Sequence, residues 1–243
     1  MNEKGDLKIL GIVGLRSGSK GIPSKNIKPL GGKPLAAWIL EALKKSGRVN
    51  KIVASTDSEE YAGIARKYGA EVPFLRPKEI SGDSSTDIEF IKHALEWYKE
   101  KESYVPDIVV RCLATCPLQR AEDIDSCIDE LINDPEADSA VVIAKAFQHP
   151  MKALKLINDG NGRKKLVSYF SQSGKEVTPL ARQSYEEAYF RANVIASRHS
   201  VIAEKNSLTG DLVRYHIIPQ ERAIDIDSPL DFIIAEQLID IQI

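Results

Sequence analysis

The chain has 243 residues, a hydrophobic content of 43% and a formal net charge of -2 at pH 7. This length suffices for one substantial core and favours a single domain with a modest appendage. The near-neutral charge argues against a general nucleic-acid or membrane-surface binder, because phosphate polymers favour a strongly basic protein face. No apolar run approaches the ~20 residues of a membrane-spanning helix, and the first residues lack a signal-peptide core, so we expect a cytoplasmic protein.

Apolar runs typical of buried strands alternate with amphipathic helical stretches over the first 150 residues. The alternation predicts an α/β fold with a mostly parallel, doubly wound sheet covered by helices on both faces. The predicted strands are residues 8–14, 51–56, 71–75, 107–114 and 139–146. The predicted helices are residues 34–46, 58–69, 85–101 and 120–134.

The alternation stops after Gln148, and the sequence becomes polar and irregular until about Ala192. Two short β-like pieces, KALKLI and KLVSYF, flank the turn sequence NDGNG. We therefore predict an inserted arm at residues 149–192, between core segments 1–148 and 193–243. So small a unit buries little surface by itself, so we expect it to cover a site or to contact a second subunit.

The core is expected to resume with three strand-like runs, and a final helix is predicted at residues 229–239. The runs are NVIA, VRYHIIP and AIDID. The three cysteines form no CxxC pair, so small buried residues are favoured over a disulfide or a zinc site. They are Cys112, Cys116 and Cys127.

The segment RSGSKGIPSKN, residues 16–26, directly follows the first predicted strand. Loops that leave the carboxyl ends of strands in an open α/β sheet face the ligand crevice. Gly18 and Gly21 allow backbone N–H groups to approach an anion, and Arg16, Lys20 and Lys25 can neutralise phosphate charge. The loop therefore predicts a nucleoside triphosphate site, although neither GxxxxGK[ST] nor GxGxxG is present. The alternative is a solvated basic loop.

Two carboxylates near the end of the chain complement this loop. In the extended run AIDID, Asp225 and Asp227 project from one face. Magnesium takes one or two carboxylates and completes its shell with phosphate oxygens and water, so the pair is a candidate Mg²⁺ site. The alternative is a merely solvated face, and we assign Ser228 and Asp231 to capping the last helix. Together, loop and carboxylates indicate phosphate chemistry.

Six motifs, in order over nearly the whole chain, resemble those of the acylneuraminate cytidylyltransferases, also called CMP-sialic acid synthetases. They are RSGSKGIPSKN, ASTDSEE, RPKEISGDSS, TCPLQ, HPMKAL and IDIDSPLD. The resemblance implies a Rossmann-like nucleotidyltransferase fold and a homodimer formed through the arm. It also implies an Mg²⁺-dependent reaction in which CTP and an acidic 3-deoxy sugar, a nonulosonic acid, give a CMP-sugar and pyrophosphate.

The resemblance also implies roles for individual residues. The triphosphate would be held by Arg16, Ser19, Lys20 and Lys25, with Asn26 beside them. The cytosine and ribose would contact Arg76 and the Asp83, Ser84 and Ser85 turn, although Arg76 could instead be exposed and the turn could instead cap the following helix. The metal pair would be Asp225 and Asp227. The sugar would face Lys152, Arg182, Gln119 and Tyr189. Lys152 and Arg182 could instead be solvated charges, and Tyr189 could instead form the dimer contact.

Departures from the family pattern concern the sugar. Leu113 stands where sialic acid members have a glutamine, Gln119 takes the place of an arginine, and Val194 replaces a glycine. An unpaired buried sugar hydroxyl is costly, so these changes favour a different substituent pattern. Legionaminic or pseudaminic acid therefore fits as well as N-acetylneuraminate.

The expected mechanism is in-line attack by the anomeric hydroxyl on the α-phosphorus of CTP. Arg16, Lys20 and Lys25 would stabilise the leaving pyrophosphate, and Asp227 would bind metal or act as the base. The alternatives are a related enzyme with another nucleotide or acceptor, and a non-catalytic nucleotide-sugar binding subunit.

Overall fold

The computed structural model describes residues 7–18, 21–170 and 184–242. The chain divides into two compact units, one of residues 1–143 and 191–243 and the other of residues 144–190. The first unit contains the predicted α/β core, and the second overlaps the predicted arm. Ser19, Lys20 and Arg182 lie outside the described residues.

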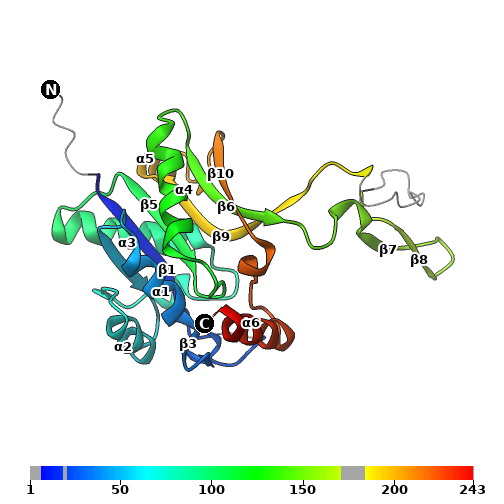
Figure 1. Ribbon diagram of the computed structural model, residues 1–243, viewed down its shortest axis with the longest axis horizontal. Helices are drawn as coiled ribbons and strands as arrows, with labels where there is room; N and C mark the ends of the chain where they lie inside the picture. Colours follow the sequence, from blue (N-terminus) through cyan, green and yellow to red (C-terminus); the bar gives the residue numbers. More distant parts are fainter. Residues whose placement is uncertain (1–6, 19–20, 171–183, 243) are drawn as a thin grey trace. The chain divides into compact units, whose positions relative to one another are not determined.

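A six-stranded sheet organises the first unit, with strand order β10-β6-β9-β5-β1-β4 (Figure 1). β1 is parallel to both of its neighbours, β4 and β5, whereas β9 runs antiparallel to β5. The mostly parallel α/β class predicted from the sequence is confirmed. The strands are β1 (Ile9–Gly14), β4 (Lys51–Ser55), β5 (Ile108–Leu113), β6 (Ser139–Lys145), β9 (Tyr189–Arg198) and β10 (Val213–Ile218).

Helices cover both faces of the sheet. Alternate strand residues point to opposite faces, so each strand contributes side chains to the packing on both sides. On one face, Leu10 and Ile12 of β1 are buried in a cluster with Phe90 of α3. On the other face, Gly11 lies against α1, where an added Cβ would come within 2.8 Å of Leu43 Cδ2. The helices are α1 (Leu35–Lys45), α2 (Glu59–Lys67), α3 (Asp87–Glu102), α4 (Ala121–Asn133), α5 (His199–Glu204) and α6 (Pro229–Gln242).

Two predicted strands are wrong. Residues 71–75 form only an isolated bridge between Glu71 and Val53, because Pro73 has no N–H to continue a ladder. In the predicted strand at residues 223–227, Ala223 ends the 3₁₀ helix η5 (Gln220–Ala223), and residues 224–227 follow it outside any strand. One backbone hydrogen bond, from Ile226 N to Thr115 O at 2.9 Å, fixes this segment beside the loop after β5. The short helix α5 was not predicted.

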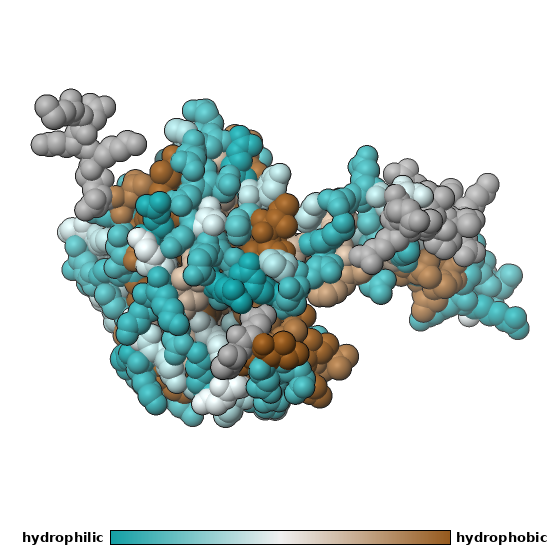
Figure 2. Space-filling view, viewed as in Figure 1, coloured by the Kyte–Doolittle hydropathy of each residue, from teal (hydrophilic) through white to brown (hydrophobic). Residues whose placement is uncertain are grey.

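The final helix has apolar side chains on two sides. Phe232 and Ala235 are buried against the core, whereas Leu230 and Ile233 are about 60% exposed. An apolar surface is visible where α6 lies in Figure 2. Within the described residues, no helix has both the length and the apolar character to cross a membrane.

The second unit contains a hairpin of β7 (Leu154–Asn158) and β8 (Lys164–Ser168). The Asp159 side chain accepts hydrogen bonds from Asn161 N and Arg163 N and thereby shapes the turn. Both predicted β-like pieces are confirmed. Leu154, Leu156 and Leu166 are each more than half exposed along the hairpin.

Short elements complete the first unit around the first loop and α1. The 3₁₀ helix η1 (Lys25–Ile27) ends that loop. The pair β2 (Pro29–Leu30) and β3 (Lys33–Pro34) then turns the chain into α1.

Candidate active site

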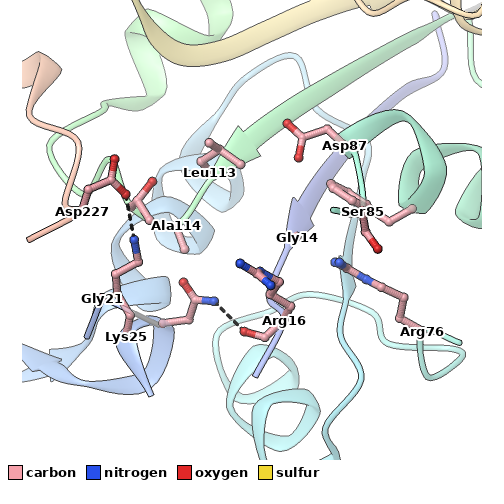
Figure 3. A pocket seen from close by; sticks show the side chains of 13 residues that line it. Gly14, Arg16, Gly21, Lys25, Arg76, Ser85, Asp87, Leu113, Ala114 and Asp227 are labelled. Atoms are coloured by element: carbon pink, nitrogen blue, oxygen red, sulfur yellow. Dashed lines mark hydrogen bonds and ion pairs between the residues drawn. The ribbon is translucent and has the colours of Figure 1, made fainter. Parts of the chain in front are cut away.

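The reversal of strand order creates a crevice at one edge of the sheet. β1 has β4 on one side and β5 on the other. The connection that follows β1 leads to β4, and the connection that follows β5 leads to β6, so the two leave in opposite directions. Ligands of open α/β sheets bind where such carboxyl ends diverge. A cavity of about 310 Å³ lies there, between the last residues of β1 and β5 (Figure 3). Its lining includes Gly14, Arg16, Gly21, Lys25, Asn26, Arg76, Ser85, Asp87, Leu113, Thr115 and Asp227.

The loop after β1 is held by hydrogen bonds to protein groups. The backbone N–H and Oγ of Ser17 donate to Asp57 at 2.8 and 2.9 Å. Asn26 is buried, and its Nδ2 donates to Arg16 O at 3.1 Å. These contacts anchor the loop at Ser17 and Asn26, and anchoring of these described residues lowers the ordering cost of binding.

Lys25 joins the loop to the distant aspartate segment. Its Nζ donates to Ile226 O at 2.6 Å and to Asp227 Oδ1 at 3.1 Å. The Lys25 side chain is only 14% exposed, whereas that of Asp227 is 78% exposed and faces the cavity. Gly21 approaches the same segment so closely that an added Cβ would lie 2.7 Å from Asp227 O. The two predicted phosphate and metal segments thus meet, and Lys25 is not a solvated surface charge.

Arg76 is a buried cation at the wall of the cavity. Its Nε donates to Ser55 Oγ at 3.0 Å, its Nη2 donates to Ser55 O at 2.6 Å, and its guanidinium lies 4.4 Å from the centre of the Phe90 ring. Burial lowers the pKa of Arg76 to about 10, so the side chain is still charged at neutral pH. The alternative of a merely exposed arginine is wrong.

The three residues of the turn before α3 differ in their position relative to the cavity. Ser85 lines the cavity, Asp83 accepts a hydrogen bond from Arg16 Nη1 at 2.8 Å, and Ser84 is exposed away from the lining. Capping of α3 is performed by Thr86, which forms a capping box with Glu89. The predicted turn is therefore free to contact a ligand at Ser85.

Asp225 and Asp227 are the candidate ligands of a divalent cation. Asp225 Oδ2 accepts a hydrogen bond from Asn193 Nδ2 at 2.6 Å, and Asp225 Oδ1 is buried without a hydrogen-bond partner among the described residues. Such an oxygen suits a cation, because a buried carboxylate oxygen without a partner is costly. No cluster of three or more His, Cys, Asp or Glu able to hold a metal occurs in the described part of the chain. Asp227 lines the cavity, whereas Asp225 does not. The unpartnered Oδ1 of Asp225 and the exposed carboxylate of Asp227 fit Mg²⁺ that takes its remaining ligands from phosphate and water.

Ser228 and Asp231 cap α6 as predicted. Ser228 N and Oγ donate to Asp231 Oδ2 at 2.7 and 2.8 Å, and Asp231 N donates to Ser228 Oγ at 3.4 Å. This reciprocal pair occupies Asp231 and leaves Asp227 available to the cavity.

A family model described as "Cytidylyltransferase" matches residues 10–237. The chain belongs to this family. It is 30% identical over 94% of its length to the N-acylneuraminate cytidylyltransferase of Escherichia coli, of which it spans 51%. It is 31% identical to the post-translational flagellin modification protein B of Campylobacter coli, over 96% of this chain and 95% of that protein.

More distant comparisons agree with this family assignment. The CMP-N,N'-diacetyllegionaminic acid synthase of Legionella pneumophila is 27% identical over 97% of both chains. A solved structure of CMP:2-keto-3-deoxy-manno-octonic acid synthetase complexed with CTP shares 13% identity at a TM-score of 0.70. That alignment covers 97% of this chain and 100% of the solved one, and it shows that the fold is shared.

Of the predicted sugar residues of this cytidylyltransferase, Arg182 lies outside the described residues, and the other three are not among those that line the cavity. Gln119 is buried, donates to Arg222 O at 3.1 Å and lines a separate hollow with Trp38 and Ala121. Lys152 lies in the 3₁₀ helix η3 (Pro150–Lys152), and Tyr189 is the first residue of β9. Both residues belong to the second unit. The Tyr189 hydroxyl donates to Glu187 Oε2 at 2.6 Å. The structure does not bring Gln119 to the cavity.

Two charged residues of the cytidylyltransferase site were missed from the sequence. Asp87, the first residue of α3, lines the cavity and pairs with Arg111 of β5 at 2.8 Å. The signal for Arg111 was present, because it is the one charge inside the apolar run IVVRCL. Asp87 had no such signal, since an acidic residue in the first turn of a helix is common.

The three cysteines are buried and free, as predicted. Burial raises the pKa of Cys116 and of Cys127 to about 12, so neither thiol is ionised at neutral pH.

Proposed function

We propose that this cytidylyltransferase couples CTP to an acidic nonulosonic sugar of the sialic, legionaminic or pseudaminic type, giving a CMP-sugar and pyrophosphate. The observation that carries the proposal is the meeting of Arg16, Lys25 and Arg76 with Asp227 around one cavity at the strand switch point. The sugar class is supported by the names of three relatives: an N-acylneuraminate cytidylyltransferase, a pseudaminic acid cytidylyltransferase and a CMP-N,N'-diacetyllegionaminic acid synthase.

The cations of the cavity would bind and orient the triphosphate. Lys25 and Arg16 are fixed by hydrogen bonds on the loop, so they can neutralise charge on the leaving pyrophosphate with little rearrangement. Lys20 and Ser19, from the same loop, are proposed to join them. Asn26 holds the Arg16 carbonyl, and Arg76 with Ser85 would contact the nucleoside on the α3 side.

Asp225 and Asp227 would hold Mg²⁺. The bound cation would supply Lewis-acid stabilisation of charge on the phosphate oxygens. Asp227 is an exposed carboxylate in the cavity lining, and it is proposed either to accept the proton of the incoming hydroxyl or to ligate the cation. Lys25, which pairs with Asp227, would hold this carboxylate in place during the in-line attack.

The second unit is proposed to form a homodimer and to supply the sugar side of the site. A two-stranded hairpin is marginally stable alone, and Leu154, Leu156 and Leu166 offer an apolar surface for a second copy. Lys152, Arg182 and Tyr189 are the proposed sugar contacts, and a cation there would bind the sugar carboxylate. Gln119 remains a proposed sugar residue only through its likeness to the family. We place the reaction in the cytoplasm, where CTP is synthesised.

The test is a pyrophosphate-release screen of four nucleoside triphosphates against a panel of nonulosonic acids, with and without Mg²⁺. We expect turnover with CTP, a requirement for Mg²⁺, and loss of turnover in the Asp225→Asn/Asp227→Asn variant. The matched control is Glu236→Gln/Asp240→Asn, which removes two exposed carboxylates of α6. Full activity of the folded Asp225→Asn/Asp227→Asn protein would reject the metal assignment, and CTP binding without turnover on any sugar would favour a non-catalytic binder.

A further inference from the structure

Arg111 is a buried cation in the middle of the sheet. It follows three apolar residues of β5, its register partners on the two neighbouring strands are Ile12 and Ile195, and its side chain is only 10% exposed. Isoleucine or valine would suit such a position. Because a buried ion pair generally gives no more stability than well-packed apolar side chains, stability alone does not explain this arginine.

The guanidinium of Arg111 connects two elements below the cavity. Its Nη2 pairs with Asp87 Oδ2 at 2.8 Å, and its Nη1 donates to Asn193 O at 3.0 Å. Its Nε is buried without a hydrogen-bond partner among the described residues. An unsatisfied donor adds a further energetic cost. The contacts of Arg111 with Asp87 and Asn193, rather than stability, are therefore what this arginine contributes.

Asn193 extends this connection to the aspartate segment. Its backbone is left-handed, with φ of 62°, which asparagine tolerates better than most residues. In that conformation its Nδ2 donates to Asp225 Oδ2 at 2.6 Å and to Cys116 Sγ at 3.3 Å. The hydrogen bond from Arg111 to the Asn193 carbonyl therefore fixes the peptide whose side chain orients Asp225.

The resulting chain of contacts runs from Asp87 through Arg111 and Asn193 to Asp225. It begins on α3, passes through β5 and β9, and ends after η5, so it joins the cavity wall to the aspartate segment. The contact with Asn193 occupies Asp225 Oδ2 and leaves Oδ1 without a partner. Such a contact behind a carboxylate ligand sets which oxygen it presents.

We propose that Arg111 is a positioning residue for the reaction: acting through Asn193, it fixes the Asp225 carboxylate by its Oδ2 atom and leaves Oδ1 as the oxygen that would ligate a divalent cation. This inference rests on the proposed function, in which Asp225 is a cation ligand. Arg111 itself does not line the cavity.

The experiment compares Arg111→Met and Asn193→Gly with wild type. Glycine keeps the left-handed backbone of position 193 and removes only the amide that holds Asp225. For both variants we expect the Mg²⁺ concentration for half-maximal activity to rise about tenfold or more, with a smaller change in KM for CTP. The readout besides activity is the affinity for Mn²⁺ in the presence of CTP, measured by electron paramagnetic resonance, which should fall by a similar factor.

The matched control is Arg198→Met, because Arg198 is a largely buried arginine that donates only to backbone carbonyls at the opposite end of β9. It should lower Tm and leave the Mg²⁺ dependence unchanged. If Arg111→Met fails to fold, Arg111→Lys and Asn193→Gly carry the test. A lower Tm with unchanged Mg²⁺ and Mn²⁺ dependence in the Arg111 and Asn193 variants would overturn the inference. A wild-type protein that releases no pyrophosphate with any substrate pair would instead reject the proposed function.

Discussion

The two edges of the sheet use the same charged residue types in opposite ways. At the carboxyl edge, Arg16, Lys25 and Arg76 surround the cavity. At the other edge, where Arg198 is the register partner of the first residue of β5, lies a second charged group. We call it the amino-edge cluster, and it consists of Asp134, Asp138, Arg198 and Lys205.

Protein groups satisfy the charges of the amino-edge cluster. Arg198 donates to the carbonyls of Ala137, Leu131 and Asp134 at 2.7–3.0 Å. Asp138 accepts hydrogen bonds from Lys205 and from two backbone N–H groups. At the cavity, by contrast, the carboxylates that pair with Arg16 and Lys25 are themselves 47% and 78% exposed. The charges of the amino-edge cluster thus stabilise the fold, whereas the charges at the cavity remain accessible to a ligand.

The largest expected effect is at the cavity. Lys25→Met should lower kcat/KM for CTP by about 10²–10³-fold, because a preorganised cation aimed at developing charge is lost. The thermal midpoint should change little, since the hydrogen bonds of Lys25 Nζ within the described residues go to the exposed Asp227 and to one carbonyl. Steady-state kinetics and a thermal melt check both statements. A large fall in Tm with unchanged kcat/KM would make Lys25 a structural residue like Arg198.

The reverse result is expected at the amino edge. Arg198→Met leaves three carbonyl oxygens without their donor, and it should lower the free energy of unfolding by about 2–3 kcal/mol. Urea denaturation measures this loss. KM for CTP should be unaffected at a temperature where the variant is folded, and a raised KM would show that the two edges are coupled.

The sequence predicts this division only in part. The alternation of strands and helices is local, so it predicts the sheet, and a loop placed directly after a strand predicts the site of Arg16 and Lys25. The meeting of Lys25 with Asp227 was inferred from chemistry. It could be inferred because phosphate transfer needs both charges, although 200 residues separate them.

Other features depend on contacts that no local pattern encodes. The amide of Asn193 reaches Asp225 only because β9 runs antiparallel beside β5, and nothing near Asn193 in the chain indicates that neighbour. Gln119 was placed by its position in a motif, but the direction of its side chain is set by the Arg222 carbonyl. Residues 223–227 alternate like a strand, yet the structure pairs none of them with a described strand.

A smaller effect is expected from the close approach of the loop to Asp227. Gly21→Ala places a Cβ about 2.7 Å from Asp227 O, so the loop and the aspartate segment must separate. We expect kcat to fall about tenfold, because a small misplacement of catalytic groups is costly. Gly63→Ala on α2 is the control, since a Cβ there meets nothing within 4 Å and the residue does not line the cavity. Equal activities of the two variants would show that the contact between Gly21 and Asp227 is dispensable.

The smallest expected effect concerns acid stability at the amino edge. The hydrogen bond from Lys205, followed by those from the Asp211 and Leu212 backbone, lowers the pKa of Asp138 from 3.8 to about 2. A lowered carboxyl pKa stabilises the folded state above the unfolded-state value, and this contribution is lost as the pH falls from 3.8 through about 2. Asp138→Asn should therefore flatten the dependence of Tm on pH between about pH 4 and pH 2. Asp240→Asn, on the exposed surface of α6, is the control. If both variants keep the wild-type slope, Asp138 does not contribute to acid stability, and the amino-edge cluster would be closer in character to the exposed pairs at the cavity.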